Sequence, residues 1–254
     1  DEDVDDDDND DEYLMDLALK NCIERYNNRP HNDNDNNYLN MSRQPFDDMI
    51  EGMKADAVDN RRIQNMAELE TYAYQVAGTV GLMLLPLLFS SSSSGTNQTM
   101  REMTAKIERG KTPAICLGKA IQLVNILRDA KQDVILGRIY LPQDLLEQNN
   151  VNEKEDILEE KTTTTTTNKA IIASDGYREV VKIVSVRAYE LLEEAEIGAK
   201  NSLSSVPYGQ LFVQIIIELY RDYLYELKYN RHYDNLHYYD DDGEGIHNND
   251  DNNR

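Results

Sequence analysis

The stretch QLVNILRDAKQD, residues 122–133, limits the fold of this chain more than any other part of it. Its apolar residues are typical of a helix that lies mostly inside a protein. Gln122, Asn125, Asp129 and Asp133 recur every three or four positions, so on a helix they share one face. Burying a carboxylate without a partner is costly. The polar face must therefore meet an internal hydrogen-bond network, a subunit contact or a ligand.

The rest of the chain also has the pattern of helices, and no segment alternates as a strand would. The longest pattern steps through Val180, Val184, Ala188, Leu191 and Ala195, which predicts one buried helix face. The expected helices cover residues 13–26, 46–58, 67–89, 99–129 with a candidate break at Gly110, 169–199 and 207–228. We expect one all-α domain over residues 1–236 and a disordered acidic tail over 237–254.

The charge of the chain excludes one class of partner. The net charge is −22, and most of the excess acid lies in residues 1–16 and 240–254. No basic patch is available for a phosphate backbone, so we expect no nucleic-acid partner. The mostly apolar run 76–89 is shorter than the roughly 20 residues of a membrane-spanning helix. We expect an intracellular protein that is soluble or peripheral to a membrane.

Asp129 and Asp133 are the candidate metal ligands that the residues themselves suggest. Like charges one helical turn apart repel each other, and a cation between them would remove that cost. Ligands that are all oxygen suit Mg²⁺, which proteins usually hold with one or two carboxylates and substrate phosphates. Mn²⁺ is the natural substitute. A DxxxD pair is unspecific by itself, so a purely structural role remains the alternative.

Several longer segments resemble the squalene/phytoene synthase family, and they occur in the family's order. NILRDAKQDVILGRIYLPQDLL (125–146) is similar to the family's second aspartate-rich region. TYAYQVAGTVGLM (71–83) resembles its tyrosine-containing helix, and QPFDDMIEGMKAD (44–56) resembles the preceding segment in plant and cyanobacterial members. Shorter matches are CIERYNNRP (22–30), RAYELLEEAEIG (187–198) and LYRDYLYEL (219–227).

The resemblance implies an all-α isoprenoid-synthase (terpenoid synthase) bundle with a central cavity. It also implies a Mg²⁺-dependent prenyltransferase of carotenoid biosynthesis. Such an enzyme condenses two geranylgeranyl diphosphates head to head, through a cyclopropyl diphosphate, to phytoene. Its partners are the allylic diphosphates, with peripheral membrane contact expected from the oily product. A plastid location is expected if the source is a photosynthetic eukaryote.

The resemblance assigns roles residue by residue. Asp129 and Asp133 match the second metal-binding pair, and Asp1 and Asp5 of DEDVD match the facing pair. Arg128 matches a diphosphate-binding arginine. Arg138 lies in the matching GRIYLP turn, where the alternatives are contact with a phosphate and capping of the preceding helix end. The catalytic set that the resemblance implies is Tyr72, Tyr220, Gln122 and Asn125, with Asn125 also near the diphosphate.

Three features keep other interpretations open. DEDVD lies in an acidic run that would contain DxxxD by accident. Gln132 stands where the family usually has Glu, and the family's helices before DEDVD are not in this sequence, which predicts an N-terminally truncated domain. The alternatives are a squalene or dehydrosqualene synthase that uses farnesyl diphosphate, and a non-catalytic member that acts as a mitochondrial assembly factor.

Overall fold

A computed structural model describes residues 17, 19–25, 27–28, 41–58, 61–90, 100–151 and 175–229. Asp1 and Asp5, most of the first expected helix and the tail 237–254 lie outside the described residues. So do the serine and threonine runs. Residues 19–25, from the first expected helix, are helical.

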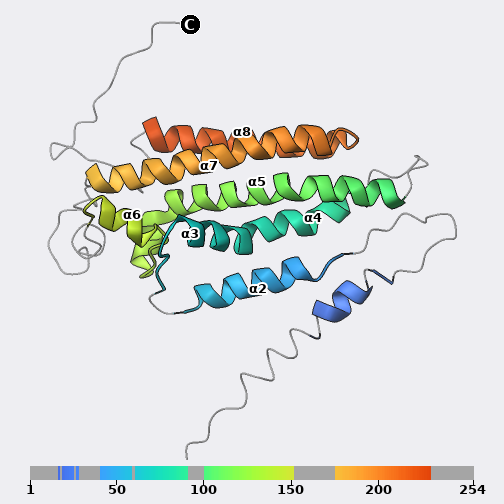
Figure 1. Ribbon diagram of the computed structural model, residues 1–254, viewed down its shortest axis with the longest axis horizontal. Helices are drawn as coiled ribbons and strands as arrows, with labels where there is room; N and C mark the ends of the chain where they lie inside the picture. The colour runs from blue at the N-terminus through green and yellow to red at the C-terminus, as the bar shows by residue number, and fades with distance from the viewer. Residues whose placement is uncertain are drawn as a thin grey trace, which may run out of the picture.

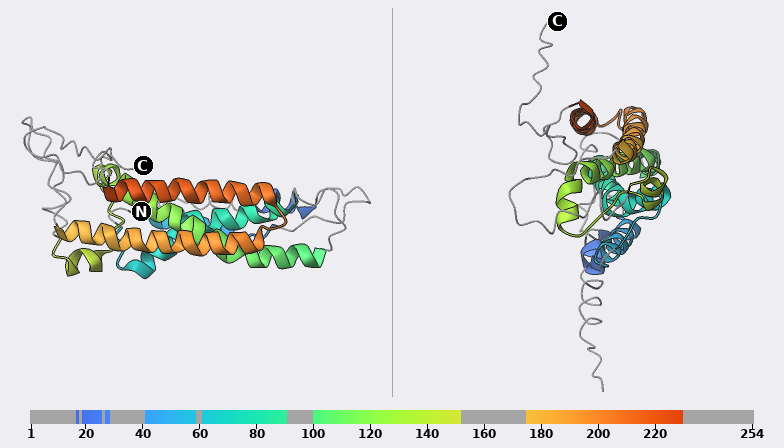
Figure 2. Two further views of the ribbon diagram at one scale, coloured as in Figure 1. Left: turned by 90° about the horizontal axis from the view of Figure 1, so that it is seen from above. Right: turned by 90° about the vertical axis from the view of Figure 1, so that its left-hand side faces the viewer.

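The named elements are all helices, and the longer ones run along one long axis (Figures 1 and 2). They are α2 (Gln44–Asp56), α3 (Met66–Ala73), the π-helical turn η1 (Tyr74–Gly78), α4 (Thr79–Ser90), α5 (Met100–Ile135), α6 (Gln143–Gln148), α7 (Asp175–Ser202) and α8 (Pro207–Tyr229). Figure 1 shows α5 between a layer of α7 and α8 and a layer of α3 and α4, with α2 below. The described residues contain no strand beyond an isolated bridge between Arg62 and Ile139. The all-α prediction is confirmed.

The main core lies where α5 packs against α7. The five α7 residues that step at helical spacing are all buried, as predicted: Val180, Val184, Ala188, Leu191 and Ala195. From α5, Leu123, Val124 and Leu127 are buried against them. The apolar residues of QLVNILRDAKQD thus lie on the side of α5 that is buried in the main core. The polar residues from Gln122 to Asp133 lie on a different side of the helix.

Close helix packing at η1 depends on small residues. A Cβ atom on Gly118 of α5 would lie 2.6 Å from the Cα atom of Gly78 and would also collide with the Ala77 carbonyl. A Cβ atom on Gly81 would lie 2.7 Å from the Ala114 carbonyl oxygen. Neighbouring backbones cannot move away from such contacts as a flexible side chain can. Glycine at positions 81 and 118 therefore allows the backbone of α5 to approach η1 and α4 closely.

The helix α5 runs without a break through Gly110 and continues past residue 129 to Ile135. It ends inside the segment 131–142, which was expected to hold the helix end and a loop. Its end is set by Gly137, whose φ of 77° is a left-handed conformation that suits glycine. The Gly137 N–H then donates to the Val134 carbonyl at 2.9 Å, and the Arg138 N–H donates to the Asp133 carbonyl at 2.8 Å. Asp133 is therefore held on the last turns of α5, one turn after Asp129.

The stretch Met66–Phe89 is long and apolar enough, by length and composition, to cross a membrane. A core helix of a globular protein meets the same two criteria. Here the stretch packs against α2 and α5 and buries Leu69, Tyr72 and Phe89. It is continuous, as predicted, except that the five residues of η1 widen into a π-turn immediately after Ala73.

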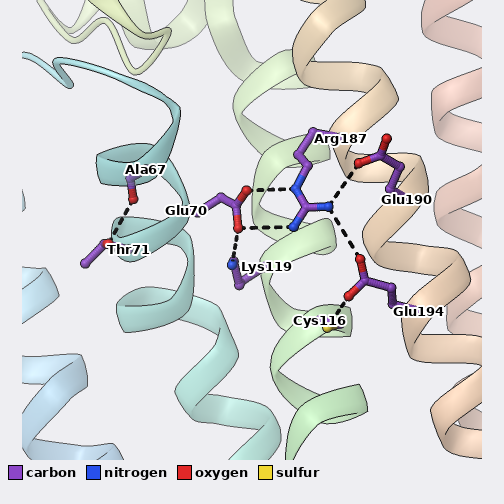
Figure 3. Close-up of polar contacts among 8 residues, drawn as sticks. All are labelled: Ala67, Glu70, Thr71, Cys116, Lys119, Arg187, Glu190 and Glu194. Carbon is purple, nitrogen blue, oxygen red and sulfur yellow. Dashed lines mark hydrogen bonds and ion pairs between the residues drawn. The ribbon is translucent and has the colours of Figure 1, made fainter.

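A network of charges ties α3, α5 and α7 together (Figure 3). Arg187 of α7 donates from Nε to Glu70 Oε1 at 2.7 Å, and Lys119 of α5 pairs with the same carboxylate. Arg187 also donates to Glu190 and Glu194 on its own helix. The network holds α3, and with it the nearby Tyr72, in register against α5.

Candidate functional site

An apolar cavity of about 280 Å³ between α4, α5 and α8 is the main candidate site among the described residues. Its walls include Val80 and Leu84 from α4 and Phe212 and Ile216 from α8. The floor is α5, from Gly110 to Asn125. Because these side chains are aliphatic or aromatic, the cavity suits an apolar ligand.

Two polar residues of α5, Gln122 and Asn125, line one end of the cavity. The Tyr220 hydroxyl of α8 donates to Asn125 Oδ1 at 3.5 Å, which is a long and weak hydrogen bond. The Tyr220 ring packs edge-on against Tyr223, with ring centroids 5.6 Å apart. The polar stripe of α5 therefore begins inside the cavity and is bordered there by the tyrosines of α8.

Arg128 and Asp129 lie one turn beyond the cavity end. Arg128 donates from Nε and Nη2 to the two carboxylate oxygens of Asp129, at 2.8 and 2.7 Å. The guanidinium carbon of Arg128 also lies 5.7 Å from the ring centroid of Tyr223. Arg128 is thus held between α5 and α8, one turn beyond the end of the cavity that Gln122 and Asn125 line.

Asp133 is half-buried and lines a small hollow with Arg138 and Tyr140. Burial, together with the charge of Asp129, raises the pKa of Asp133 to about 6, although Arg138 opposes the shift. The two carboxylates that share a face thus repel each other. A divalent cation beside both would relieve the repulsion and favour the ionised form of Asp133.

A second cluster surrounds Asp133 and draws on residues far from it in sequence. Asp56, the last residue of α2, accepts a hydrogen bond from the Tyr140 hydroxyl at 2.6 Å. Its other oxygen lies 3.9 Å from Arg138 Nη1. The rings of Tyr72 and Tyr140 stack with centroids 5.3 Å apart and an interplanar angle of 12°.

The predicted residues thus divide into two groups that meet at Asp129 and Asp133. Gln122, Asn125, Arg128 and Tyr220 lie at or near the apolar cavity. Tyr72, expected as a cavity tyrosine, is buried with 4% of its surface exposed and belongs to the second cluster. Arg138 pairs loosely with Asp56, and half of its side chain is exposed.

The donor set fits Mg²⁺ in part. Two carboxylates one turn apart are the number that Mg²⁺ usually takes from a protein when substrate phosphates complete its shell. Within the described ranges, no group of three or more His, Cys, Asp or Glu side chains could hold a metal. Any facing carboxylates would have to come from elsewhere, and Asp1 and Asp5 lie outside the described residues. The metal site therefore stays a prediction.

Asp56 and Tyr223 were missed by the sequence analysis, and Tyr140 was given no role. Tyr140 has a weak sequence signal, because it follows Arg138 in the GRIYLP turn directly after the polar stripe. Asp56 carries no signal of its own, since a single acid at the end of an amphipathic helix is common. Its importance comes from the contact with Tyr140, which is 84 residues away.

Comparison with known proteins gives one matching family. Residues 28–239 match the family model described as squalene/phytoene synthase. Phytoene synthase 1, chloroplastic, of Zea mays is 35% identical over 217 residues, covering 85% of this chain and 44% of the maize protein. Phytoene synthase 2, chloroplastic, of Solanum lycopersicum is 38% identical over 217 residues, covering 85% of this chain and 58% of the tomato protein. The chain thus spans about half the length of these relatives.

A solved structure supports the fold. The crystal structure of YisP from Bacillus subtilis matches 78% of this chain and 66% of its own, with a TM-score of 0.56 and 24% identity. At that identity the likeness concerns the helical architecture alone.

Proposed function

This chain belongs to the squalene/phytoene synthase family, and on that premise we propose that it is a phytoene-synthase-like prenyltransferase. The reaction joins two molecules of geranylgeranyl diphosphate head to head. One diphosphate ionises, and its cation is captured by a double bond of the second molecule to give a cyclopropyl diphosphate. A second ionisation, rearrangement and proton loss then give phytoene.

The observation that carries the proposal is the position of the polar stripe on α5. Gln122 and Asn125 close one end of an apolar cavity, and Asp129 and Asp133 continue along the same helix face. A prenyl diphosphate has the same division into an apolar chain and an anionic head. The cavity would take the chain, and the head would lie toward Asp129.

Four residues would act on the diphosphate group. Asp129 and Asp133 would hold Mg²⁺, and Arg128 and Arg138 would bind phosphate oxygens directly. The metal, when bound, would neutralise the charge of the departing diphosphate. The pairing of Arg128 with the partly exposed carboxylate of Asp129 supports this role, because a diphosphate could take the place of that carboxylate.

The apolar walls would protect the reactive cation. Aliphatic side chains from α4 and α8 line the space where the chain would lie, and a bound prenyl chain between them would displace water from it. Aromatic faces such as that of Tyr220 stabilise positive charge without forming a bond to it. Asn125, held by the Tyr220 hydroxyl, would orient the reacting end of the substrate.

The proposal also includes contact with a membrane and a location in the cell. Phytoene is an oil, so its release would bring the protein into peripheral contact with a membrane. The names of the maize and tomato relatives place those proteins in the chloroplast. A plastid location follows for this chain if its source is a photosynthetic eukaryote.

The test is an incubation with labelled geranylgeranyl diphosphate, with Mg²⁺ or with EDTA, followed by extraction of the hydrocarbon. We expect phytoene with Mg²⁺, none with EDTA, and none from Asp129→Ala. Farnesyl diphosphate is assayed in parallel. Product from the C15 substrate alone would replace this proposal with squalene or dehydrosqualene synthesis. No product from either substrate, in a protein shown to be folded, would overturn enzymatic activity for this chain.

A further inference from the structure

Asp56 and Tyr140 have no role in the reaction proposed above. Their contact joins the end of α2 to the segment that follows α5. Asp56 ends α2, and Tyr140 follows the Gly137 turn at the end of α5. The Tyr140 hydroxyl donates to Asp56 Oδ1 at 2.6 Å, a short bond to a charged acceptor. Asp56 Oδ2 lies 3.9 Å from Arg138 Nη1. The Asp56 carboxylate therefore contacts both Arg138 and Tyr140, which follow Asp133 along the chain.

Tyr140 in turn sets the place of Tyr72. The two rings are nearly parallel, at 12°, with centroids 5.3 Å apart. The guanidinium carbon of Arg61 lies 5.0 Å from the centroid of the Tyr72 ring. Burial, together with the neighbouring Tyr140 and Asp56, raises the pKa of Tyr72, so its phenol stays protonated near neutral pH.

Backbone contacts keep the two segments together. Arg62 forms a parallel bridge with Ile139. The Gln143 N–H donates to the Ile63 carbonyl at 2.9 Å, and the Asp144 N–H donates to the Gln64 carbonyl at 3.0 Å. The backbone therefore brings the rings close, while the hydrogen bond to Asp56 decides how the Tyr140 ring is turned.

We propose that Asp56 and Tyr140 are positioning residues that fix the Tyr72 phenol and the Arg138 guanidinium beside the Asp133 end of α5. This inference rests on the proposed function, because it assigns the two residues to the same reaction. Tyr140 acts through its stacked ring on Tyr72, and Asp56 acts through Tyr140 and Arg138.

The molecule contains a matched control for this inference. The Tyr74 hydroxyl donates to Asp48 Oδ2 at 2.5 Å, and Asp48 lies on α2 as Asp56 does. Tyr74→Phe and Tyr140→Phe thus each remove one tyrosine-to-aspartate hydrogen bond to the same helix. Of the two tyrosines, Tyr140 is the one stacked on Tyr72.

The kinetic test compares these variants under saturating Mg²⁺. We expect Tyr140→Phe to lower kcat about tenfold with KM within about twofold, and Tyr74→Phe to leave both within about twofold. Because Tyr140 acts through Tyr72, the double variant Tyr72→Phe/Tyr140→Phe should be no slower than Tyr72→Phe alone. Asp56→Asn keeps an oxygen that can accept from Tyr140, so it should retain more activity than Asp56→Ala. Equal loss in Tyr140→Phe and Tyr74→Phe, or additive losses in the double variant, would overturn the inference.

A spectroscopic experiment tests this inference independently of the proposed enzymatic activity. The chain has 16 tyrosines and no tryptophan, so its near-UV circular dichroism reports mainly on tyrosine rings. Asp56→Ala removes no tyrosine, and it should nevertheless change the near-UV spectrum of the wild type. The same substitution should have little effect in the Tyr140→Phe background.

An inactive wild-type chain would count against the proposed function, while the spectra would still decide whether Asp56 orients Tyr140. A near-UV spectrum that Asp56→Ala leaves unchanged, or changes equally in both backgrounds, would refute the positioning role. Far-UV spectra confirm that each variant is folded.

Discussion

Glu70 of α3 and Arg187 of α7 lie 117 residues apart in sequence, and Arg187 Nε donates to Glu70 Oε1 at 2.7 Å. Lys119 of α5 pairs with the same carboxylate, so one acid holds three helices (Figure 3). Burial would raise the pKa of Glu70, but the hydrogen bonds from Arg187 and Lys119 outweigh it and lower the pKa below its ordinary value. This relationship leads to the first of four predictions.

Glu70→Gln should destabilise the fold by about 1–3 kcal/mol at neutral pH, since it leaves two half-buried cations without their shared anion. Because the folded-state pKa is lowered, the contribution of Glu70 is complete above its ordinary pKa. It is lost as the pH falls through the folded value. The difference in Tm between wild type and variant should therefore shrink in acid. The exposed Glu193 of α7 supplies the control, because Glu193→Gln should show neither effect. A constant difference from pH 7 to pH 3 would contradict the assignment.

Gly118→Ala should destabilise the protein by about 1–3 kcal/mol, because the added methyl group meets the backbone of Ala77 and Gly78. Gly110→Ala lies on the same helix, and its added methyl group would meet the end of the Leu85 side chain, which can turn aside. Its cost should stay within about 1 kcal/mol, because Ala also favours the helix. Urea denaturation measures both values. Equal stabilities for the two variants would argue against close backbone packing at η1.

Cys116 should be nearly inert to thiol reagents in the native protein. Burial raises its pKa to about 11, aided by the hydrogen bond from its thiol to Glu194 Oε2 at 3.4 Å. Cys22 is exposed. Iodoacetamide at pH 8, followed by peptide mass spectrometry, should label Cys22 at least about tenfold faster. In urea the two rates should converge, and equal rates in the native state would show that α5 opens readily there.

Asp129→Asn and Asp133→Asn should each weaken Mn²⁺ binding at least about tenfold in the presence of inorganic pyrophosphate. The physical reason is that each variant removes one of two carboxylates on the same helix face. Asp175→Asn removes one negative charge from a side chain that is 99% exposed, and it should bind Mn²⁺ as the wild type does. Electron paramagnetic resonance of free Mn²⁺ measures the affinity. Unchanged binding in both α5 variants would exclude the pair as ligands.

The helices were predictable because their signals are local. The spacing from Val180 to Ala195 predicted the buried face of α7. The end of α5 was predicted only to within the segment 131–142, because residues 130–135 continue a helical pattern and the stop depends on Gly137 in a left-handed conformation. The π-turn at Tyr74–Gly78 has no sequence pattern of its own and was missed.

The sequence by itself determined the all-α class, the family, and the shared helix face of Gln122, Asn125, Asp129 and Asp133, because helical periodicity follows from backbone geometry. The tertiary structure decided which distant groups meet that face. Tyr220 reaches Asn125, Asp56 holds Tyr140, and Tyr72 stacks on Tyr140 away from the apolar cavity. Periodicity shows which side of a helix points inward. The neighbour it meets depends on the offset and rotation of the packed helices, which arise from the whole core at once.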